Sequence, residues 1–393
     1  MKLTYKHTMF ACFVGYVVQA IIVNFLPLLF LTFQTQYGIP LSTVTFLVTF
    51  NFGLQLLVDF ISPGIVARVG QRVSLVAAHL FGAAGLLSLV FLPELLPDPF
   101  TGLLIAVVLY AIGGGLLEVL VSPVVESCPS DNKEGTMSLL HSFYCWGHVG
   151  VVLVSTAFFF TFGIENWKIL AGLWAIIPLA NAFLCARIPY APLLEEGESE
   201  MPVKELLRQP LFWMFVLLMT CAGASEQAVA QWVSAFAERG LGISKTLGDL
   251  AGPLFFATCM GLCRLLYGKF SERLNLQKAL LLSGLLCVVS YAVIAFSPWP
   301  VVSLLGCGVC GFAVGILWPG TFSMAAATMR RGATAMFAYL ALAGDLGCSL
   351  GPTVAGKVAG ALGDNLHLGI FSAVVFPVVM IAGLLVYRKM KVK

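Results

Sequence analysis

Charged side chains are scarce in this chain of 393 residues. Asp, Glu, Lys and Arg make up 10% of it, against about 25% in an ordinary soluble domain. Hydrophobic residues make up 59%, and the mean hydropathy is +0.95. A water-soluble enzyme of this length could not bury so much apolar surface, so the composition predicts an integral membrane protein.

Signatures of enzymes and primary pumps are also missing. The chain has no His-Glu-x-x-His zinc motif and no Walker-type phosphate loop. Ala343-Gly344-Asp345 resembles part of an intramembrane aspartyl protease motif, but no Tyr precedes an Asp anywhere in the chain. These absences favour a protein that is not an enzyme and needs no cofactor. Without a basic tract, nucleic acid is not an expected partner either.

The cysteines do not form a disulfide or metal pattern. There are 11 of them, an odd number, and nearly all fall inside apolar runs. The one Cys-x-x-Cys, at Cys307 and Cys310, has no second thiol pair or histidine cluster to accompany it. A packing role is therefore expected here, and no metal site.

Twelve apolar runs are long enough to cross about 30 Å of hydrocarbon as helices. They lie near 8–33, 42–67, 73–93, 100–125, 137–163, 167–189, 210–236, 247–268, 277–297, 299–327, 333–360 and 366–387. The first run is too long for a signal-peptide core and lacks a cleavage site, so we interpret it as a true span. The fold class expected is an all-α integral membrane protein with twelve transmembrane helices.

The basic residues predict an orientation. With the N-terminus in the cytoplasm, 17 of the 22 Lys and Arg residues lie inside, 4 lie outside, and Arg264 falls within a span. This bias follows the positive-inside rule and places both termini in the cytoplasm. Residues 191–209, which are polar and rich in Glu, form the expected cytoplasmic linker between an N-terminal bundle, 1–190, and a C-terminal bundle, 210–393.

The two halves share an internal repeat. The fourth and tenth spans both carry Gly-x7-Pro, at Gly115–Pro123 and at Gly311–Pro319, an offset of 196 residues. The fifth and eleventh spans each have two glycines 12 residues apart, at an offset of 197. Duplicated six-helix halves are typical of secondary transporters, whose substrate site lies at mid-membrane between the halves.

These motifs resemble the major facilitator superfamily over the whole chain. Gly64-x3-Arg68-x-Gly70-x-Arg72 is similar to the cytoplasmic loop signature of that superfamily, although Ala67 stands where an acid is usual. Within the superfamily the chain most resembles the fucose–proton symporter group of sugar permeases. The resemblance rests on three segments: Gly115-Leu116-Leu117-Glu118 before Pro123, Ser142-Phe143 with Trp146-Gly147, and Gly223-Ala224-Ser225-Glu226 with Gln231-Trp232.

One departure from that group concerns proton transfer. Fucose-type permeases carry an acid in the first span shortly before a proline, whereas this chain reads Asn24-Phe25-Leu26-Pro27. The first span has no acid at all. A proton role in that span is therefore not expected.

Five charged residues remain at membrane depth, where each costs at least about 2.5–3.5 kcal/mol. They are Asp59, Glu118, Glu226, Arg264 and Asp345. Glu118, Glu226 and Asp345, together with His148 as the repeat mate of Asp345, are candidates for proton coupling or solute binding. Asp59 and Arg264 fall one position apart when the second and eighth spans are aligned on Gly64 and Gly268, and they are predicted to pair as an inner gate. Direct contact of Arg264 with an anionic solute is the alternative.

Softer candidates could line a central cavity: Asn24, Asn51, Gln55, His141, Tyr144, Trp146, Gln227, Gln231 and Trp318. His141 and His148 are seven residues apart, and Gln227 and Gln231 are four apart, so each pair shares a helix face. Trp146, Trp232 and Trp318 could stack on a sugar ring. For all of these residues packing is the competing interpretation, as it is for Asp345 among Gly344, Gly347 and Gly351.

The expected function is secondary active transport of a small polar solute, with a sugar as the favoured class, by alternating access with proton coupling. The alternatives are a proton-driven exporter of amphipathic compounds and a solute sensor that transports nothing. The expected setting is a monomer in the lipid bilayer of a bacterial inner membrane. The expected partners are a small molecule and the coupling proton.

Overall fold

The computed structural model describes residues 3–194, 198–233, 245–363 and 365–391. Within these ranges the chain is helical and contains no strand. Residue contacts divide it into two compact units, each described below by itself. Unit 1 comprises Met1–Pro129 and Trp146–Glu195, and unit 2 comprises Ser130–Cys145 and Glu196–Lys393. The first part of one long helix, α6, therefore belongs to unit 2 and the remainder to unit 1. Part of the expected linker, 195–197, lies outside the described residues.

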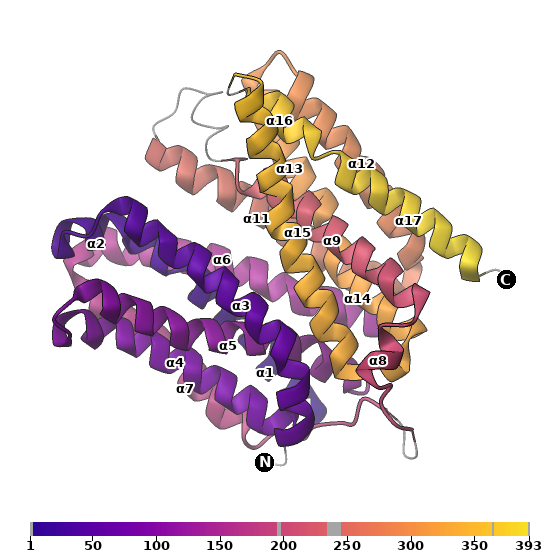
Figure 1. Cartoon of the computed structure of the whole chain (residues 1–393), viewed down its shortest axis with the longest axis horizontal. Coiled ribbons are helices and arrows are strands. Elements are labelled where there is room, and N and C mark those ends of the chain that lie inside the picture. The colour runs from indigo at the N-terminus through magenta and orange to yellow at the C-terminus, as the bar shows by residue number, and fades with distance from the viewer. Residues whose placement is uncertain (1–2, 195–197, 234–244, 364, 392–393) are drawn as a thin grey trace. The chain divides into compact units, whose positions relative to one another are not determined.

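Unit 1 is built from long helices that run alongside one another (Figure 1). They are α1 (Tyr5–Asn24), α2 (Phe30–Tyr37), α3 (Leu41–Val69), α4 (Gln71–Leu95), α5 (Pro99–Ser127), the later part of α6 (Lys133–Phe162) and α7 (Trp167–Cys185). Two 3-10 turns, η1 (Leu26–Leu29) and η2 (Ile164–Asn166), join neighbouring helices.

Unit 2 contains the first part of α6 and the second half of the chain. Its helices are α8 (Val203–Leu206), α9 (Pro210–Ala230), α11 (Lys245–Phe270), α12 (Leu276–Phe296), α13 (Pro300–Val314), α14 (Leu317–Thr328), α15 (Ala333–Ala361), α16 (Leu366–Ser372) and α17 (Val375–Lys391). The turns η3 (Ser271–Arg273) and η4 (Arg330–Gly332) complete it.

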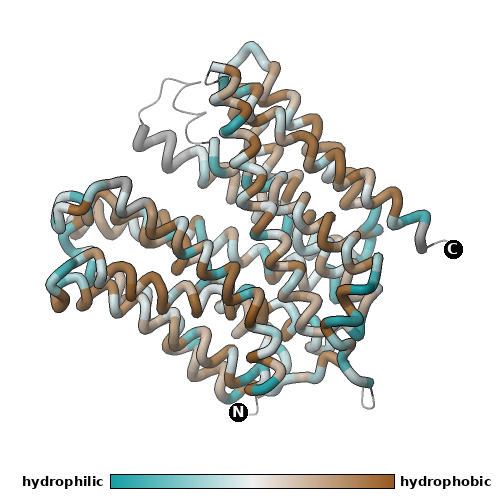
Figure 2. The backbone as a smooth tube through the Cα atoms, in the orientation of Figure 1, coloured by the Kyte–Doolittle hydropathy of each residue, from teal (hydrophilic) through white to brown (hydrophobic). Residues whose placement is uncertain are grey.

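Eleven helical segments among the described residues are long and apolar enough to cross a membrane. They correspond to every predicted span except 247–268. That range is occupied by α11, a helix of 26 residues, and the side chains of its first seven residues lie outside the described part of the chain. Figure 2 shows the hydrophobic colour along most of the length of the helices, with hydrophilic residues gathered near their ends.

Three predicted spans are interrupted rather than continuous. The helix breaks lie between α1 and α2, between α13 and α14, and between α16 and α17. A proline stands within the first break, at Pro27, and just after the other two, at Pro319 and Pro377. Proline has no backbone N–H and collides with the carbonyl four residues earlier, so the helix is interrupted there.

Glycine contacts bring helices of each unit close together. In unit 1, a methyl group added at Gly113 of α5 would lie 2.6 Å from the carbonyl oxygen of Ala78 in α4. In unit 2, one added at Gly347 of α15 would overlap the carbonyl oxygen of Thr220 in α9. Small residues that permit such close approach are typical of membrane helix interfaces. Gly347 therefore lies at a close contact between α15 and α9, and the role of Asp345 stays a prediction.

Candidate functional site

Unit 1 holds a polar cluster between three of its helices, which we call the Glu118 cluster: Gln19, Asn51, Gln55 and Glu118. Glu118 on α5 accepts a hydrogen bond from Nε2 of Gln19 on α1, with 2.7 Å between the two atoms. One turn along, the hydroxyls of Tyr16 and Ser122 lie 3.0 Å apart. Two polar contacts, one helical turn apart, therefore join the antiparallel helices α1 and α5.

The helix α3 supplies the remaining carboxamides of this cluster. Gln55 faces Gly114 of α5, where an added methyl group would lie 2.5 Å from Nε2 of Gln55. Gly114 precedes Glu118 by four residues and so shares its helix face. Asn51 precedes Gln55 by the same interval on α3. The absence of a side chain at Gly114 thus makes room for a polar group beside Glu118.

Three buried atoms of these carboxamides have no hydrogen-bond partner among the described residues. They are Oε1 of Gln19, Oδ1 of Asn51 and Nε2 of Gln55. The three side chains are only 4%, 4% and 2% exposed, respectively. A buried polar group without a partner costs about 1–3 kcal/mol, and in native proteins such groups ordinarily bind water or a ligand. The cluster therefore presents two acceptors and one donor that could bind a water molecule or a ligand.

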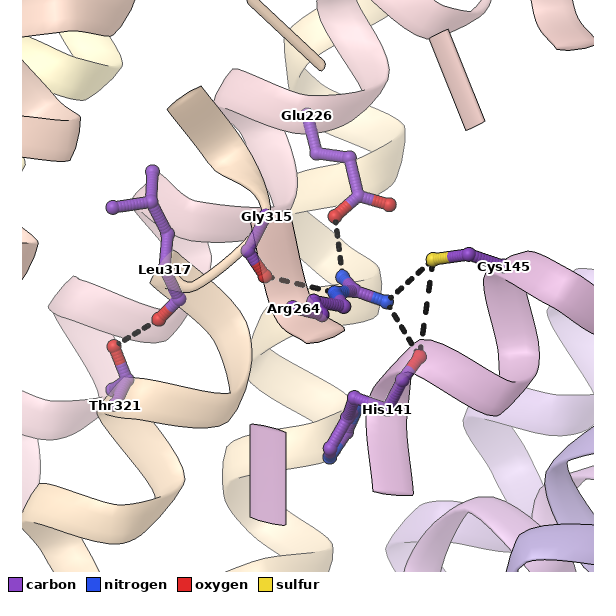
Figure 3. A network of polar contacts seen from close by, with 7 residues as sticks. All are labelled: His141, Cys145, Glu226, Arg264, Gly315, Leu317 and Thr321. Carbon is purple, nitrogen blue, oxygen red and sulfur yellow. Dashed lines mark hydrogen bonds and ion pairs between the residues drawn. The ribbon is translucent and has the colours of Figure 1, made fainter. Parts of the chain in front are cut away.

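Unit 2 holds a different arrangement, which we call the Arg264 cluster: Glu226, Arg264, Gly315 and the α6 turn from His141 to Cys145 (Figure 3). The Nη2 atom of Arg264 donates to Oε2 of Glu226 at 3.3 Å. Its Nη1 atom donates to the His141 carbonyl at 3.0 Å and to Sγ of Cys145 at 3.2 Å. Its Nε atom donates to the Gly315 carbonyl at 2.8 Å.

The broken helix explains why an arginine is needed here. Pro319 has no N–H, so the carbonyl of Gly315, four residues earlier, cannot receive its usual helical hydrogen bond. That carbonyl lies at the break between α13 and α14, and Arg264 supplies the missing donor. Arg264 is 3% exposed, and each of its three side-chain nitrogens has an acceptor. Its charge is offset by Glu226, as a buried cation requires.

The predicted gate pair is not the pair found within unit 2. Arg264 binds Glu226 there, while Asp59 lies in α3 of unit 1, fully buried. The Asp59 carbonyl, which Pro63 deprives of its helical donor, accepts from the Ser62 hydroxyl at 3.2 Å. A contact between Asp59 and Arg264 would join the two units, and it stays a prediction.

Aromatic side chains surround the Arg264 cluster on one side. The rings of His141 and Phe322 lie 5.8 Å apart between centroids, and those of Trp318 and Phe322 lie 6.2 Å apart. The Trp318 ring covers Gly344 of α15, where no larger residue would fit. At 8% exposure Trp318 packs within unit 2, which limits the face it could offer to a solute.

The other predicted site residues fall into several environments. Asn24 ends α1 and donates to the Ala20 carbonyl at 2.9 Å. Asp345 is partly buried in α15, and its carbonyl accepts from Ser349 at 3.2 Å. Gln231 follows the last residue of α9 and is exposed. Four more are partly buried: Tyr144, Trp146, His148 and Gln227. His148 and Asp345 belong to different units, so their predicted apposition stays a prediction.

A literal Gly-x-Ser-x-Gly match occurs at Gly347-Cys348-Ser349-Leu350-Gly351. It lies inside α15 and not at the strand-to-helix turn that a nucleophile elbow requires. The Ser349 hydroxyl donates to a backbone carbonyl of its own helix. The match therefore gives no sign of a hydrolase. Among the described residues, no three His, Cys, Asp or Glu side chains are grouped to hold a metal ion.

Sequence reasoning missed the partner of Glu118. Gln19 is one of the few polar residues in the first apolar run, and the rule that singled out Asn24 would also have found it. It missed a second buried pair in unit 1 as well, in which Nε2 of His79 lies 2.7 Å from Nδ2 of Asn181. Both pairs join residues about 100 positions apart, and no local pattern reveals such a contact.

Comparison with proteins of known structure supports the fold. The chain is 16% identical to FucP in its outward conformation, with a TM-score of 0.80 and coverage of 95% and 97% of the two chains. It is 15% identical to the human organic anion transporter MFSD10, with a TM-score of 0.75 and coverage of 96% and 99%. For the proton:xylose symporter XylE the values are 14%, 0.75, 96% and 94%.

Sequence comparison adds a curated relative and a family. The membrane protein MosC of Rhizobium meliloti is 24% identical over 297 residues, which cover 75% of this chain and 69% of that protein. The family model of the Major Facilitator Superfamily matches residues 8–352. The chain is therefore a multi-pass membrane protein that belongs to the Major Facilitator Superfamily, a family of transporters.

Proposed function

We propose that the protein is a proton-coupled secondary transporter of a small, hydroxyl-rich polar solute, with a sugar as the favoured class, that works by alternating access. The Glu118 cluster carries this proposal. It combines one carboxyl group with three buried carboxamide atoms that have no partner among the described residues. The proposed location is a bacterial inner membrane with both termini in the cytoplasm, supported by the bias of basic residues.

The unpartnered atoms match the chemistry of a hydroxyl group. Oε1 of Gln19 and Oδ1 of Asn51 can only accept a hydrogen bond, while Nε2 of Gln55 can only donate one. A hydroxyl does both, so neighbouring hydroxyls of one solute satisfy all three atoms. An amphipathic compound with few polar groups would leave some of them unsatisfied. Both FucP and XylE are similar in fold. FucP is described as a fucose:proton symporter and XylE as a proton:xylose symporter.

Glu118 supplies the proposed proton site. An ionised carboxylate accepts hydrogen bonds only, whereas a protonated carboxyl can also donate one. Gln19 presents both of the matching groups: Nε2 donates to Glu118, and Oε1 has room to accept. Gain or loss of a proton at Glu118 therefore changes the hydrogen bonding of Gln19, which also contacts the proposed solute. This shared side chain couples the proton to the solute.

The Arg264 cluster does not favour an anionic solute. The guanidinium already has an acceptor for each of its nitrogens, and one of these acceptors is the Glu226 carboxylate. An anion would have to displace Glu226 and leave that carboxylate without its cation. A neutral polar solute requires no such exchange.

The proposal can be tested with purified protein in sealed liposomes that contain a pH-sensitive dye. Neutral sugars, polyols, organic acids and cationic amphiphiles are added outside, one at a time. We expect internal acidification with a neutral sugar or polyol. Glu118→Gln should abolish the acidification. Glu94→Gln is the matched control, because Glu94 is an exposed acid that pairs with Lys168 at the surface of unit 1.

Three outcomes would contradict the proposal. Acidification only with organic acids would assign an anionic substrate. Outward movement of cationic amphiphiles against a proton gradient would assign an exporter. Protection from thermal unfolding by a solute that never enters the liposomes would assign a sensor.

A further inference from the structure

We propose that unit 1 carries a binding site for the headgroup of an anionic phospholipid, formed by Arg72 at the start of α4 and Arg187 just after α7. The site is separate from the Glu118 cluster and does not depend on the transported solute. It is argued from the position of the two guanidinium groups, from the lack of an ion-paired acid, and from the apolar surface beside them.

The two arginines are neighbours through one peptide group. The Nη1 atom of Arg72 donates to the carbonyl oxygen of Ala186 at 2.5 Å, and Arg187 is the next residue. The helices α4 and α7, which carry them, pack along each other in unit 1 (Figure 1). Two positive charges are therefore held at the same end of this helix pair.

Aromatic rings fix the direction of both side chains. The guanidinium of Arg187 lies 3.6 Å from the centroid of the Phe183 ring, one turn earlier on α7. That of Arg72 lies 5.0 Å from the centroid of the Tyr190 ring. Such stacking limits the freedom of a guanidinium and leaves its N–H groups at the edge available to an oxygen ligand. A phosphate group matches this fork of donors and can accept two parallel hydrogen bonds from it.

Nothing described in the structure neutralises the two charges. Both arginines are exposed, and neither forms an ion pair with a carboxylate among the described residues. Tyr190 does not offset them either, because burial raises the pKa of its hydroxyl above its ordinary value. That hydroxyl donates instead to the carbonyl of Cys185 at 2.9 Å. A ligand that binds both guanidinium groups should therefore be an anion.

The surface beside the arginines fits acyl chains. On α7 the exposed residues Ile176, Leu179 and Phe183 share one face that ends at Arg187. On α4 the exposed residues Val73 and Leu80 form a similar stripe next to Arg72. A free phosphate ion would use only the charges, whereas a phospholipid would use the charges and both stripes. The proposed occupant is thus an anionic phospholipid.

The test measures binding of the first lipid to the purified full-length protein in detergent by native mass spectrometry. Phosphatidylglycerol is compared with phosphatidylcholine of the same acyl chains. We expect phosphatidylglycerol to bind more tightly. Arg72→Gln together with Arg187→Gln should weaken its binding about 30-fold, since each basic residue near a lipid surface contributes about 1 kcal/mol and 1.4 kcal/mol is tenfold. Arg388→Gln, at an exposed arginine of α17 in unit 2, should change it less than twofold.

A second variant separates weaker lipid binding from misfolding of the protein. The Arg187 side chain has no hydrogen bond to lose among the described contacts, and its backbone N–H bond to Leu184 is kept in any variant, so Arg187→Gln alone should fold normally and weaken binding about fivefold. Arg187→Lys should restore most of the affinity. Equal binding of the two lipids, or equal effects of the Arg187 and Arg388 substitutions, would overturn the proposal. Complete displacement of the lipid by millimolar inorganic phosphate would instead show a site for small anions and would also overturn it.

Discussion

The two units place a carboxyl group at membrane depth in opposite ways. In unit 1, Glu118 accepts a hydrogen bond from the neutral amide of Gln19, and three buried carboxamide atoms nearby have no partner among the residues that the structure describes. In unit 2, Glu226 accepts from the cation Arg264, whose other donors are used on backbone and thiol acceptors. The comparison teaches that an acid in a span is not by itself a functional site: its partners decide what it can do.

Each arrangement suits a different task. A carboxylate beside a guanidinium forms an ion pair, and breaking a buried pair is costly. The Arg264 cluster therefore stabilises the α13–α14 break and the turn of α6 that packs in the same unit. A carboxyl among neutral carboxamides can change its protonation without leaving a buried cation behind. The predictions below test this contrast between the two units.

The largest expected effect is on stability, in unit 2. Arg264→Gln should lower the free energy of unfolding by about 3–5 kcal/mol, because it leaves Glu226 without its cation and removes a donor from the Gly315 carbonyl. Thermal unfolding in detergent measures the loss. Glu226→Gln should be destabilising as well, because Gln keeps an acceptor for Arg264 but leaves its buried charge without an anion. If Arg264→Gln lowered the melting temperature no more than Arg388→Gln does, Arg264 would not stabilise the α13–α14 break.

Glycine substitutions should affect the two units equally, because both depend on close helix approach. Gly113→Ala in α5 and Gly347→Ala in α15 each push a methyl group against a backbone carbonyl, and overpacking of this kind costs about 1–3 kcal/mol. Gly360→Ala is the matched control, since nothing lies within 4 Å of an added methyl group there. If only one of the two substitutions greatly lowered the melting temperature, the units would differ in packing as well as in charge.

The smallest effect concerns the helix that carries Glu118. Asp98 caps α5 by accepting hydrogen bonds from the hydroxyl and N–H of Thr101, and these lower the pKa of Asp98 below its ordinary value. A lowered pKa stabilises the fold above the unfolded-state pKa of about 3.9, and this contribution is lost as the pH falls through the folded-state pKa. Asn275, which caps α12 in unit 2, does not titrate.

The difference in melting temperature between the wild type and Asp98→Asn should therefore shrink as the pH is lowered from about 5 to below the folded-state pKa. The corresponding difference for Asn275→Ala should not depend on pH. Parallel pH curves for the two variants would contradict a charged cap on α5.

The sequence predicts the fold well because its signals are local. Apolar run length, the charge bias and the repeated glycine and proline positions are each read within one span or between equivalent spans. The breaks are harder to place, since a proline such as Pro123 can also lie within an unbroken helix, as it does in α5. At the α13–α14 break, the carbonyl that Pro319 leaves free on Gly315 accepts from Arg264 of another helix, a contact that no local pattern reveals.

The partners in the candidate site could not be predicted for the same reason. Glu118 and Arg264 stand out because charge is rare in a span, but the sequence does not show which side chain reaches them. Repeat alignment suggested Asp59 for Arg264, which stays a prediction, and it did not suggest Glu226, the partner of Arg264 within unit 2. Contacts between distant helices depend on their rotation and register, and helix packing in three dimensions sets both.

The most direct test of the contrast measures proton-driven accumulation and solute exchange for Glu118→Gln and Glu226→Gln in the same liposomes, with the solute found by the acidification assay. Glu118→Gln should lose accumulation driven by a proton gradient and keep exchange of solute across the membrane. Glu226→Gln should keep both, with rates scaled only by the amount of folded protein. Accumulation by Glu118→Gln at the wild-type level, or its selective loss in Glu226→Gln, would contradict the assignment of proton coupling to unit 1.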